Sequence, residues 1–121
     1  MPKQKRMMPS ERAIRTYWLR TDLPKDKGFD AIEFMGGICF ACGMDSKCER
    51  AHILARCVGG TDSAENLHML CGICHKDSEA LSGNDYHNWL LERNAMDMLT
   101  SMAVRRGINL WTLLMLKESA K

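Results

Sequence analysis

The sequence has no long apolar run, and this absence excludes one class of protein at once. A transmembrane helix needs about 18 or more consecutive apolar residues. The longest uncharged stretch, Phe34 to Met44, is much shorter and contains three glycines. No apolar run follows the basic N-terminus, so a secretory signal is not evident either. We therefore expect a cytoplasmic protein that is not secreted and does not associate with a membrane.

Extremes of composition are also missing. Hydrophobic residues make up 45% of the chain and charged residues 26%, which is ordinary globular usage and excludes wholesale disorder. Internal repeats and low-complexity tracts are absent from the sequence. The 121 residues give room for one domain. We expect a basic arm, a helix and a linker in 1–37, a core in 38–80, and a C-terminal helical pair in 81–121, packed on the core or on a partner.

The net charge of +2 combines two unlike regions. Residues 1–20 carry six basic groups and one acidic group, a net charge of +5, whereas the other 101 residues carry 11 basic and 14 acidic groups, a net charge of −3. A basic arm on a near-neutral body suits a polyanionic partner such as DNA. On charge alone, a tail that only increases solubility explains the asymmetry equally well.

The cysteines indicate a metal site. In a chain without an export signal, cysteines are more often metal ligands or buried thiols than disulfides. Cys39 and Cys42 form one CxxC pair, and Cys71 and Cys74 form another. Two such turns can supply the four thiolates of a tetrahedral zinc site. A site of this kind is structural, because no coordination position stays open.

Spacing and turn residues predict a helix near the N-terminus. Ser10 is a suitable N-cap, and apolar residues such as Ile14 and Trp18 then recur at helical spacing. Pro24 should end this run. Residues 25–37 are expected to form a linker.

Short apolar patches broken by turn residues predict two strands in the next part of the chain. We expect the strands at about 49–54 and 67–70, joined by a loop that contains Gly59 and Gly60. A short helix should follow from Cys74.

The C-terminal third has a helical pattern. A long apolar stripe predicts a helix from Asn84 to a C-cap-like Gly107. Asn109 can begin a last helix that is apolar nearly all round, through Leu110, Leu113, Leu114 and Leu116. Such a helix has to be buried against the domain or against a partner, in a homodimer or on a larger protein.

The polar residues around the second cysteine pair resemble a known family. His52, Gly59-Gly60, Asn66-Leu67 and Cys71-Gly-Ile-Cys74-His75 follow one another in this order. The ordered set resembles the zinc-containing HNH endonucleases, the ββα-metal nucleases, over about residues 38–80. The resemblance implies an α+β fold, with a small zinc-stabilised ββα-metal core between N-terminal and C-terminal helices. It also suggests a protein of phages or mobile elements, at work in a bacterial or phage-infected cell.

The resemblance gives three polar residues a role. His52 matches the general base that deprotonates the attacking water, a task that suits imidazole. His75 matches a ligand of a catalytic divalent ion (Mg²⁺, Mn²⁺ or another) that stabilises the leaving 3′ oxygen. Asn66 matches the residue whose amide ties the connecting loop and so helps to orient the base. The implied function is metal-dependent hydrolysis of DNA phosphodiester bonds, with 5′-phosphate products.

Ala51 departs from the family pattern, because the residue before the base is usually an Asp or His that helps to hold the ion. Glu79 lies four residues after His75, on the same face of a helix, and is our first choice for the missing ligand. Glu49 shares a strand face with Ala51 and is the second choice. Asp77 should point away. Alternatively, the site is degenerate and inactive.

Several basic residues are candidates for phosphate contacts, which position a nucleic acid without reading its sequence. These candidates are Lys3, Lys5, Arg6, Arg12, Arg15, Arg50, Arg56 and Lys76. With them the chain can also act as a non-catalytic zinc module that binds nucleic acid. A further alternative is an accessory subunit whose apolar C-terminal helix docks on a larger nuclease or packaging machine.

Four residues with reactive side chains have no role in this scheme. We expect His68 to be structural and His87 to lie on the surface. Cys48 and Cys57 are expected to be buried or loop thiols, although Cys48 can also replace Cys39 in the zinc set.

Overall fold

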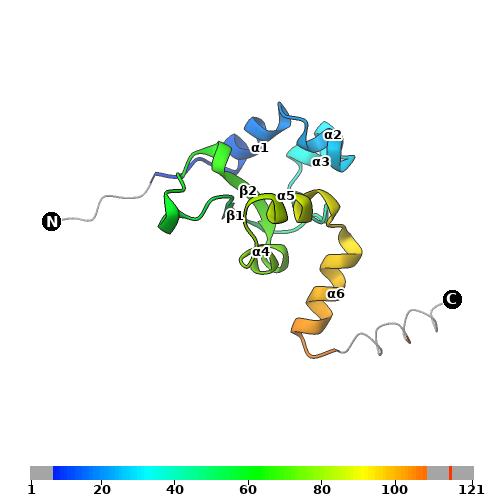
Figure 1. Cartoon of the computed structure of the whole chain (residues 1–121). Coiled ribbons are helices and arrows are strands. Elements are labelled where there is room, and N and C mark those ends of the chain that lie inside the picture. Colours follow the sequence, from blue (N-terminus) through cyan, green and yellow to red (C-terminus); the bar gives the residue numbers. More distant parts are fainter. Residues whose placement is uncertain (1–6, 109–114, 116–121) are drawn as a thin grey trace.

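The computed structural model describes residues 7–108 and Met115. This part of the chain is α+β, with two antiparallel strands among the helices (Figure 1). The elements are α1 (Glu11–Leu19), α2 (Leu23–Lys27), α3 (Ala31–Met35), β1 (Cys48–His52), η1 (Arg56–Val58), η2 (Ala64–Asn66), β2 (Leu67–Cys71), α4 (Gly72–Ser78), α5 (Gly83–Glu92) and α6 (Ala95–Arg105). Among the described residues, no helix has the length and apolar character needed to cross a bilayer.

The centre of the molecule is a β-hairpin followed at once by a helix. β1 and β2 pair antiparallel, with Cys48 opposite Cys71 and His52 opposite Leu67. α4 begins at the residue after β2, so the order of elements is β1, β2, α4. Both strands lie within two residues of the ranges that the sequence predicts, and α4 begins two residues earlier.

Helix α1 is capped at its start and bonded to this unit near its end. The Ser10 hydroxyl caps the helix by accepting a hydrogen bond from the Ala13 amide at 3.1 Å. Near the other end, the Trp18 indole N–H donates to the carbonyls of Ala64 and Leu67, at 3.0 and 2.7 Å. α1 therefore holds the segment that leads into β2 through the Trp18 side chain.

Residues 25–37 are not the plain linker that the sequence suggested. They contain the end of α2, the left-handed Gly28 that terminates it (φ 76°), and the whole of α3. α3 starts with a capping box, in which Asp30 accepts from the Glu33 amide and Glu33 accepts from the Asp30 amide. Phe34 of α3 is fully buried, so this segment contributes to the core.

The helix expected from Asn84 to Gly107 is also divided. α5 ends at Glu92, Arg93 is extended, and Asn94 caps α6 in a second capping box with Asp97. The prediction of one helix was wrong because an N-cap inside an apolar stripe does not interrupt the stripe's periodicity. The last helix expected from Asn109 lies outside the described residues.

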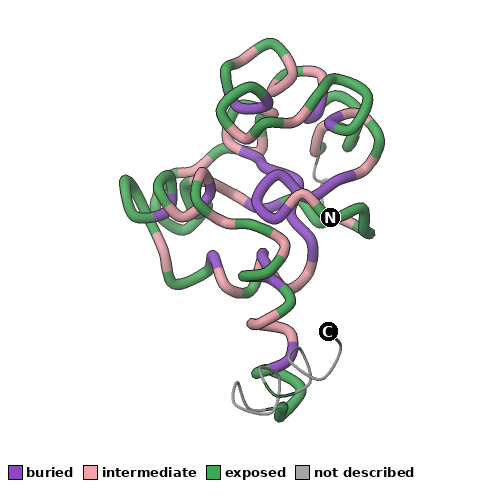
Figure 2. Tube along the Cα trace, turned by 90° about the vertical axis from the view of Figure 1, so that its right-hand side faces the viewer, coloured by how far each residue is buried: buried purple, intermediate pink, exposed green. Residues whose placement is uncertain are grey.

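The core joins all parts of the described chain. Figure 2 shows most buried residues in the middle of the molecule, with shorter buried stretches in the segments around it. The largest buried apolar side chains belong to Ile14, Phe34, Phe40, Leu67, Met69, Leu70 and Leu90. Each such side chain contributes about 1.5–3 kcal/mol of burial free energy. All five residues of β2 are buried, so the strand that leads into α4 is held on both faces.

Polar contacts attach the C-terminal helices to this core. The Lys27 ammonium donates to the carbonyls of Leu90 and Arg93, at 2.7 and 2.6 Å, and so satisfies the end of α5. Asp77 on α4 accepts from Arg93 and from Arg105, each at 2.6 Å. α4, α5 and α6 therefore meet at one carboxylate.

Candidate metal centre and histidine sites

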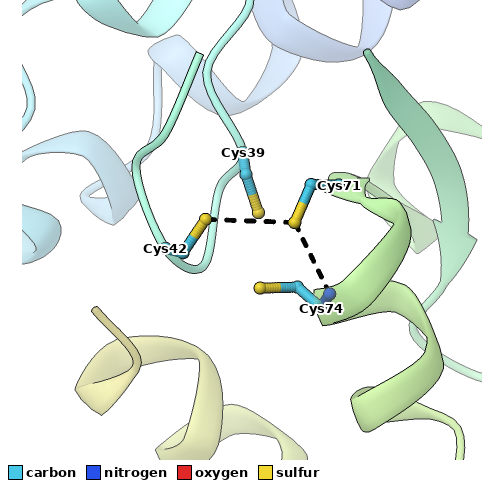
Figure 3. A group of neighbouring side chains, drawn as sticks. All are labelled: Cys39, Cys42, Cys71 and Cys74. Atoms are coloured by element: carbon cyan, nitrogen blue, oxygen red, sulfur yellow. Dashed lines mark hydrogen bonds between the residues drawn. The ribbon is translucent and has the colours of Figure 1, made fainter. Parts of the chain in front are cut away.

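The four cysteines of the two CxxC pairs come together. Their sulfur atoms all lie within 4.8 Å of one another, and the sulfurs of Cys42 and Cys71 are 3.9 Å apart. Tetrahedral zinc with bonds of about 2.3 Å separates its sulfur ligands by about 3.8 Å. Figure 3 shows the side chains of one loop facing those of the start of α4. The residues Cys39, Cys42, Cys71 and Cys74 are thus placed to hold a metal ion, in agreement with the predicted zinc set.

Each pair is held by its own backbone. In the first loop, the Cys39 amide donates to the Met44 carbonyl at 3.0 Å, and the Gly43 amide donates to the Cys39 carbonyl at 2.9 Å. Gly43 has φ 77°, which a glycine adopts without strain. In the second pair, Cys71 is the N-cap of α4, and its sulfur accepts from the Cys74 amide. These contacts shape the two turns that carry the sulfurs.

The chemistry of the cluster also suits a cation. All four cysteines are buried. Hydrogen bonds from the thiols of Cys42, Cys71 and Cys74 lower the pKa of Cys39, whereas the same shared network raises the pKa of Cys74. Several thiolates this close together repel one another, and a bound cation offsets that repulsion. Four sulfur ligands are the donor set that zinc prefers, so the cluster is consistent with structural zinc.

The two other cysteines lie outside this cluster. The Cys48 thiol faces the carbonyls of Gly37 and Ser46, at 3.6 and 3.5 Å, and burial raises its pKa to about 11. Cys57 is exposed in η1. Cys39 rather than Cys48 belongs to the set, as its CxxC spacing predicted.

His75 faces β1 from the first turns of α4. Its Nδ1 lies 2.9 Å from Oε1 of Glu49, and the His75 side chain is 30% exposed. The partner is therefore the second-choice carboxylate of the sequence analysis, which shares a strand face with the buried Ala51. Glu79 is the C-cap of α4, and its role as a ligand stays a prediction. In the described chain, the four cysteines form the only cluster of three or more candidate metal ligands.

Asp77 points away from this face, as expected. It accepts hydrogen bonds from Arg93 and Arg105. Burial raises the pKa of Asp77, but hydrogen bonds from Ser101, Arg105 and Arg93 outweigh that effect and hold the pKa below its usual value. Its function is to anchor α4 to the C-terminal helices.

His52 is the last residue of β1 and meets a residue that the sequence analysis did not single out. Its Nε2 lies 2.8 Å from Oδ1 of Asp62, which comes from the loop between the strands. The Arg56 guanidinium lies 3.7 Å from the same oxygen. The signal in the sequence was an Asp two residues after Gly59-Gly60, but only the closure of the loop makes it a neighbour of His52.

Asn66 ties the loop. Its amide group donates to the carbonyls of Leu54 and Thr61, at 3.0 and 2.8 Å, and its oxygen accepts from the Leu54 amide at 2.8 Å. All three bonds are to backbone. They agree with the loop-bracing role that the resemblance gives to this residue.

The basic candidates have different surroundings. Arg12, Arg50, Arg56 and Lys76 are exposed, and Arg50 donates to the Pro9 carbonyl at 2.9 Å. Arg15 is only 2% exposed, and its guanidinium bonds to the carbonyls of Phe34 and Ile38 and to Glu11. The prediction that Arg15 contacts phosphate is therefore wrong, because its donors fix α1 to α3. The three arm residues Lys3, Lys5 and Arg6 lie outside the described residues.

The remaining histidines behave as expected. His68 is buried among Trp18, Phe40 and Tyr86, and its Nδ1 lies 2.6 Å from the Tyr86 hydroxyl. Burial lowers the pKa of His68 to about 3, so it is a neutral core residue at physiological pH. His87 is exposed on α5.

Comparisons with protein-family models, curated proteins and solved structures found no match to this chain.

Proposed function

We propose that this protein is a metal-dependent DNA endonuclease of the HNH type. The observation that carries the proposal is the arrangement on the β1–β2–α4 unit. His52 ends β1 beside Asp62, while His75 on α4 pairs with Glu49 of the same strand at 2.9 Å. The cysteine cluster fixes the start of the helix that carries His75. These elements follow the order that the resemblance to ββα-metal nucleases implies.

His52 is the general base in this proposal. Its imidazole takes a proton from the water that attacks phosphorus, a role that contributes about 10²- to 10⁴-fold in rate. The exposed Arg50, Arg56 and Lys76 are the phosphate contacts around the reacting group. The reaction breaks the bond to the 3′ oxygen and leaves the phosphate on the 5′ side.

His75 would hold the divalent ion, and Glu49 would orient its ring through their hydrogen bond. Carboxylate–histidine pairs of this kind are typical of metal-binding histidines. When bound, Mg²⁺ or Mn²⁺ supplies Lewis-acid stabilisation of the leaving oxygen. His75 would supply one ligand, and water and substrate oxygens would fill most of the remaining positions.

A second candidate is a non-catalytic zinc module or accessory subunit that binds nucleic acid. Ala51 favours it, because this buried residue stands where the family usually has a metal ligand. The apolar residues Met96, Val104 and Ile108 favour the accessory role, since they are exposed on or just after α6. Both alternatives predict binding without cleavage.

A plasmid-relaxation assay separates these functions. The parent should cut supercoiled DNA when Mg²⁺ or Mn²⁺ is added and not when divalent ions are omitted. His52→Ala and His75→Ala should each lose at least about 10²-fold in rate while keeping fold and DNA affinity. The control is His87→Ala, because His87 is an exposed histidine outside the site. A parent that cuts with no divalent ion, or an equally active His52→Ala, contradicts the proposal.

A further inference from the structure

The loop between the two strands brings a carboxylate to His52. Asp62 and His52 are ten positions apart in the sequence, yet Oδ1 and Nε2 are separated by 2.8 Å. Both side chains are mostly buried, with 18% and 21% of their surface exposed. A mostly buried pair at this distance is shielded from water and holds its geometry better than an exposed pair does.

Hydrogen bonds hold the two residues that precede Asp62 in the loop. Asn66 donates to the Thr61 carbonyl, directly before Asp62, and also bonds to both backbone groups of Leu54. The Gly60 amide donates to the Ala55 carbonyl at 2.9 Å. A Cβ at Gly60 would lie 1.8 Å from the Leu54 carbonyl oxygen, so this close approach requires glycine. The position of Asp62 is therefore built into the loop.

This contact determines which nitrogen of His52 carries the proton. An ionised carboxylate can only accept a hydrogen bond, so Nε2 must be the N–H donor. In a neutral imidazole the lone pair then lies on Nδ1. Nδ1 is consequently the atom that can accept a proton from water. Arg56 adds a positive charge 3.7 Å from the same Asp62 oxygen.

We propose that Asp62 is the positioning residue for His52, and that it fixes the Nε2–H tautomer and the orientation of the ring. This inference rests on the proposed nuclease function. In the reaction, an O–H bond of water breaks, Nδ1 of His52 gains that proton, and the oxygen forms the new bond to phosphorus. The 3′ oxygen leaves and takes a proton from solvent. Asp62 stays ionised throughout and stabilises the imidazolium, as a carboxylate behind a catalytic histidine does.

The test compares Asp62→Asn with Glu65→Gln. Glu65→Gln is the matched control, because it removes one negative charge from an exposed position in the same loop. Long-range ¹H–¹⁵N NMR, recorded over a pH series, reports the tautomer of the ring directly. We expect Nε2–H in the parent and in Glu65→Gln, and a mixture or the Nδ1–H form in Asp62→Asn. This measurement does not depend on cleavage.

The second readout is single-turnover cleavage. Asp62→Asn should lower the rate about 10- to 100-fold, a part of what the general base supplies, without changing zinc content or DNA affinity. An Nδ1–H tautomer in the parent, an unchanged tautomer in Asp62→Asn, or equal rates for both loop variants overturns the proposal. The tautomers can behave as expected while the parent never cuts DNA. In that case the nuclease function and the role of Asp62 in catalysis are both wrong, but Asp62 still fixes the tautomer of His52.

Discussion

The cysteine cluster and the histidine face belong to the same β1–β2–α4 unit, but they differ in burial and in number of ligands. The four cysteines are buried and converge on one point, whereas His75 and Glu49 form an exposed pair. A structural metal site is complete without solvent, while a catalytic one keeps positions open for water and substrate. Under the proposed function, α4 serves both kinds of site, because its successive residues Cys74 and His75 face different environments.

The largest expected effect is on the cysteine side of this comparison. Cys71→Ser should lose the metal and unfold residues 38–80, because binding of zinc supplies about 10 kcal/mol or more of folding free energy in small sites. Cys57→Ser is the matched control, since Cys57 is exposed and outside the cluster. Elemental analysis and circular dichroism check this prediction. Folded parent protein that contains no zinc would contradict it.

An intermediate effect is expected at the support of α4, on which both sites depend. Asp77→Asn weakens charge-assisted hydrogen bonds from Arg93 and Arg105 and should lower the unfolding free energy by about 2 kcal/mol. Because folding lowers the pKa of Asp77, its contribution is present above the unfolded value of about 3.9 and is lost as the pH falls through the folded value.

Urea titrations with excess Zn²⁺ measure this effect. The gap between parent and Asp77→Asn should be constant near neutral pH and should narrow in acid. Asp85→Asn, at an exposed position on α5, is the control and should change little. If the difference in unfolding free energy between parent and Asp77→Asn widens in acid, folding raises the pKa of Asp77 and the prediction is wrong.

The smallest effect is expected on the histidine face. Glu49→Gln should weaken Mn²⁺ binding about tenfold, because it disturbs the carboxylate that orients His75, and should leave the fold unchanged. Glu79→Gln is the comparison variant. Isothermal titration calorimetry measures the Mn²⁺ affinity of both variants. A larger loss of affinity in Glu79→Gln would indicate that Glu79 is the ligand that compensates for Ala51.

Local patterns made the hairpin and the cysteine set predictable. A CxxC turn aims two thiols at one point by itself, and the strand ranges follow from nearby turn residues. The sequence did not reveal contacts that depend on closure of the chain. Arg15 seemed a surface cation because it belongs to the basic N-terminal region, but Phe34 and Ile38 bring carbonyls to it from far along the chain. Asp62 was missed for the same reason.

Cys74 and His75 are consecutive residues of α4, and a helix turns about 100° from one residue to the next. The backbone that positions the Cys74 side chain therefore also positions the His75 side chain. A change at the buried cysteine cluster is transmitted through α4 to the surface. An agent that removes a metal ion from the cysteine cluster should therefore also disturb the position of His75. Loss of activity with a strong chelator could then result from a displaced α4. Omission of Mg²⁺ and Mn²⁺ from the assay is therefore the cleaner measure of whether a divalent ion takes part in the chemistry.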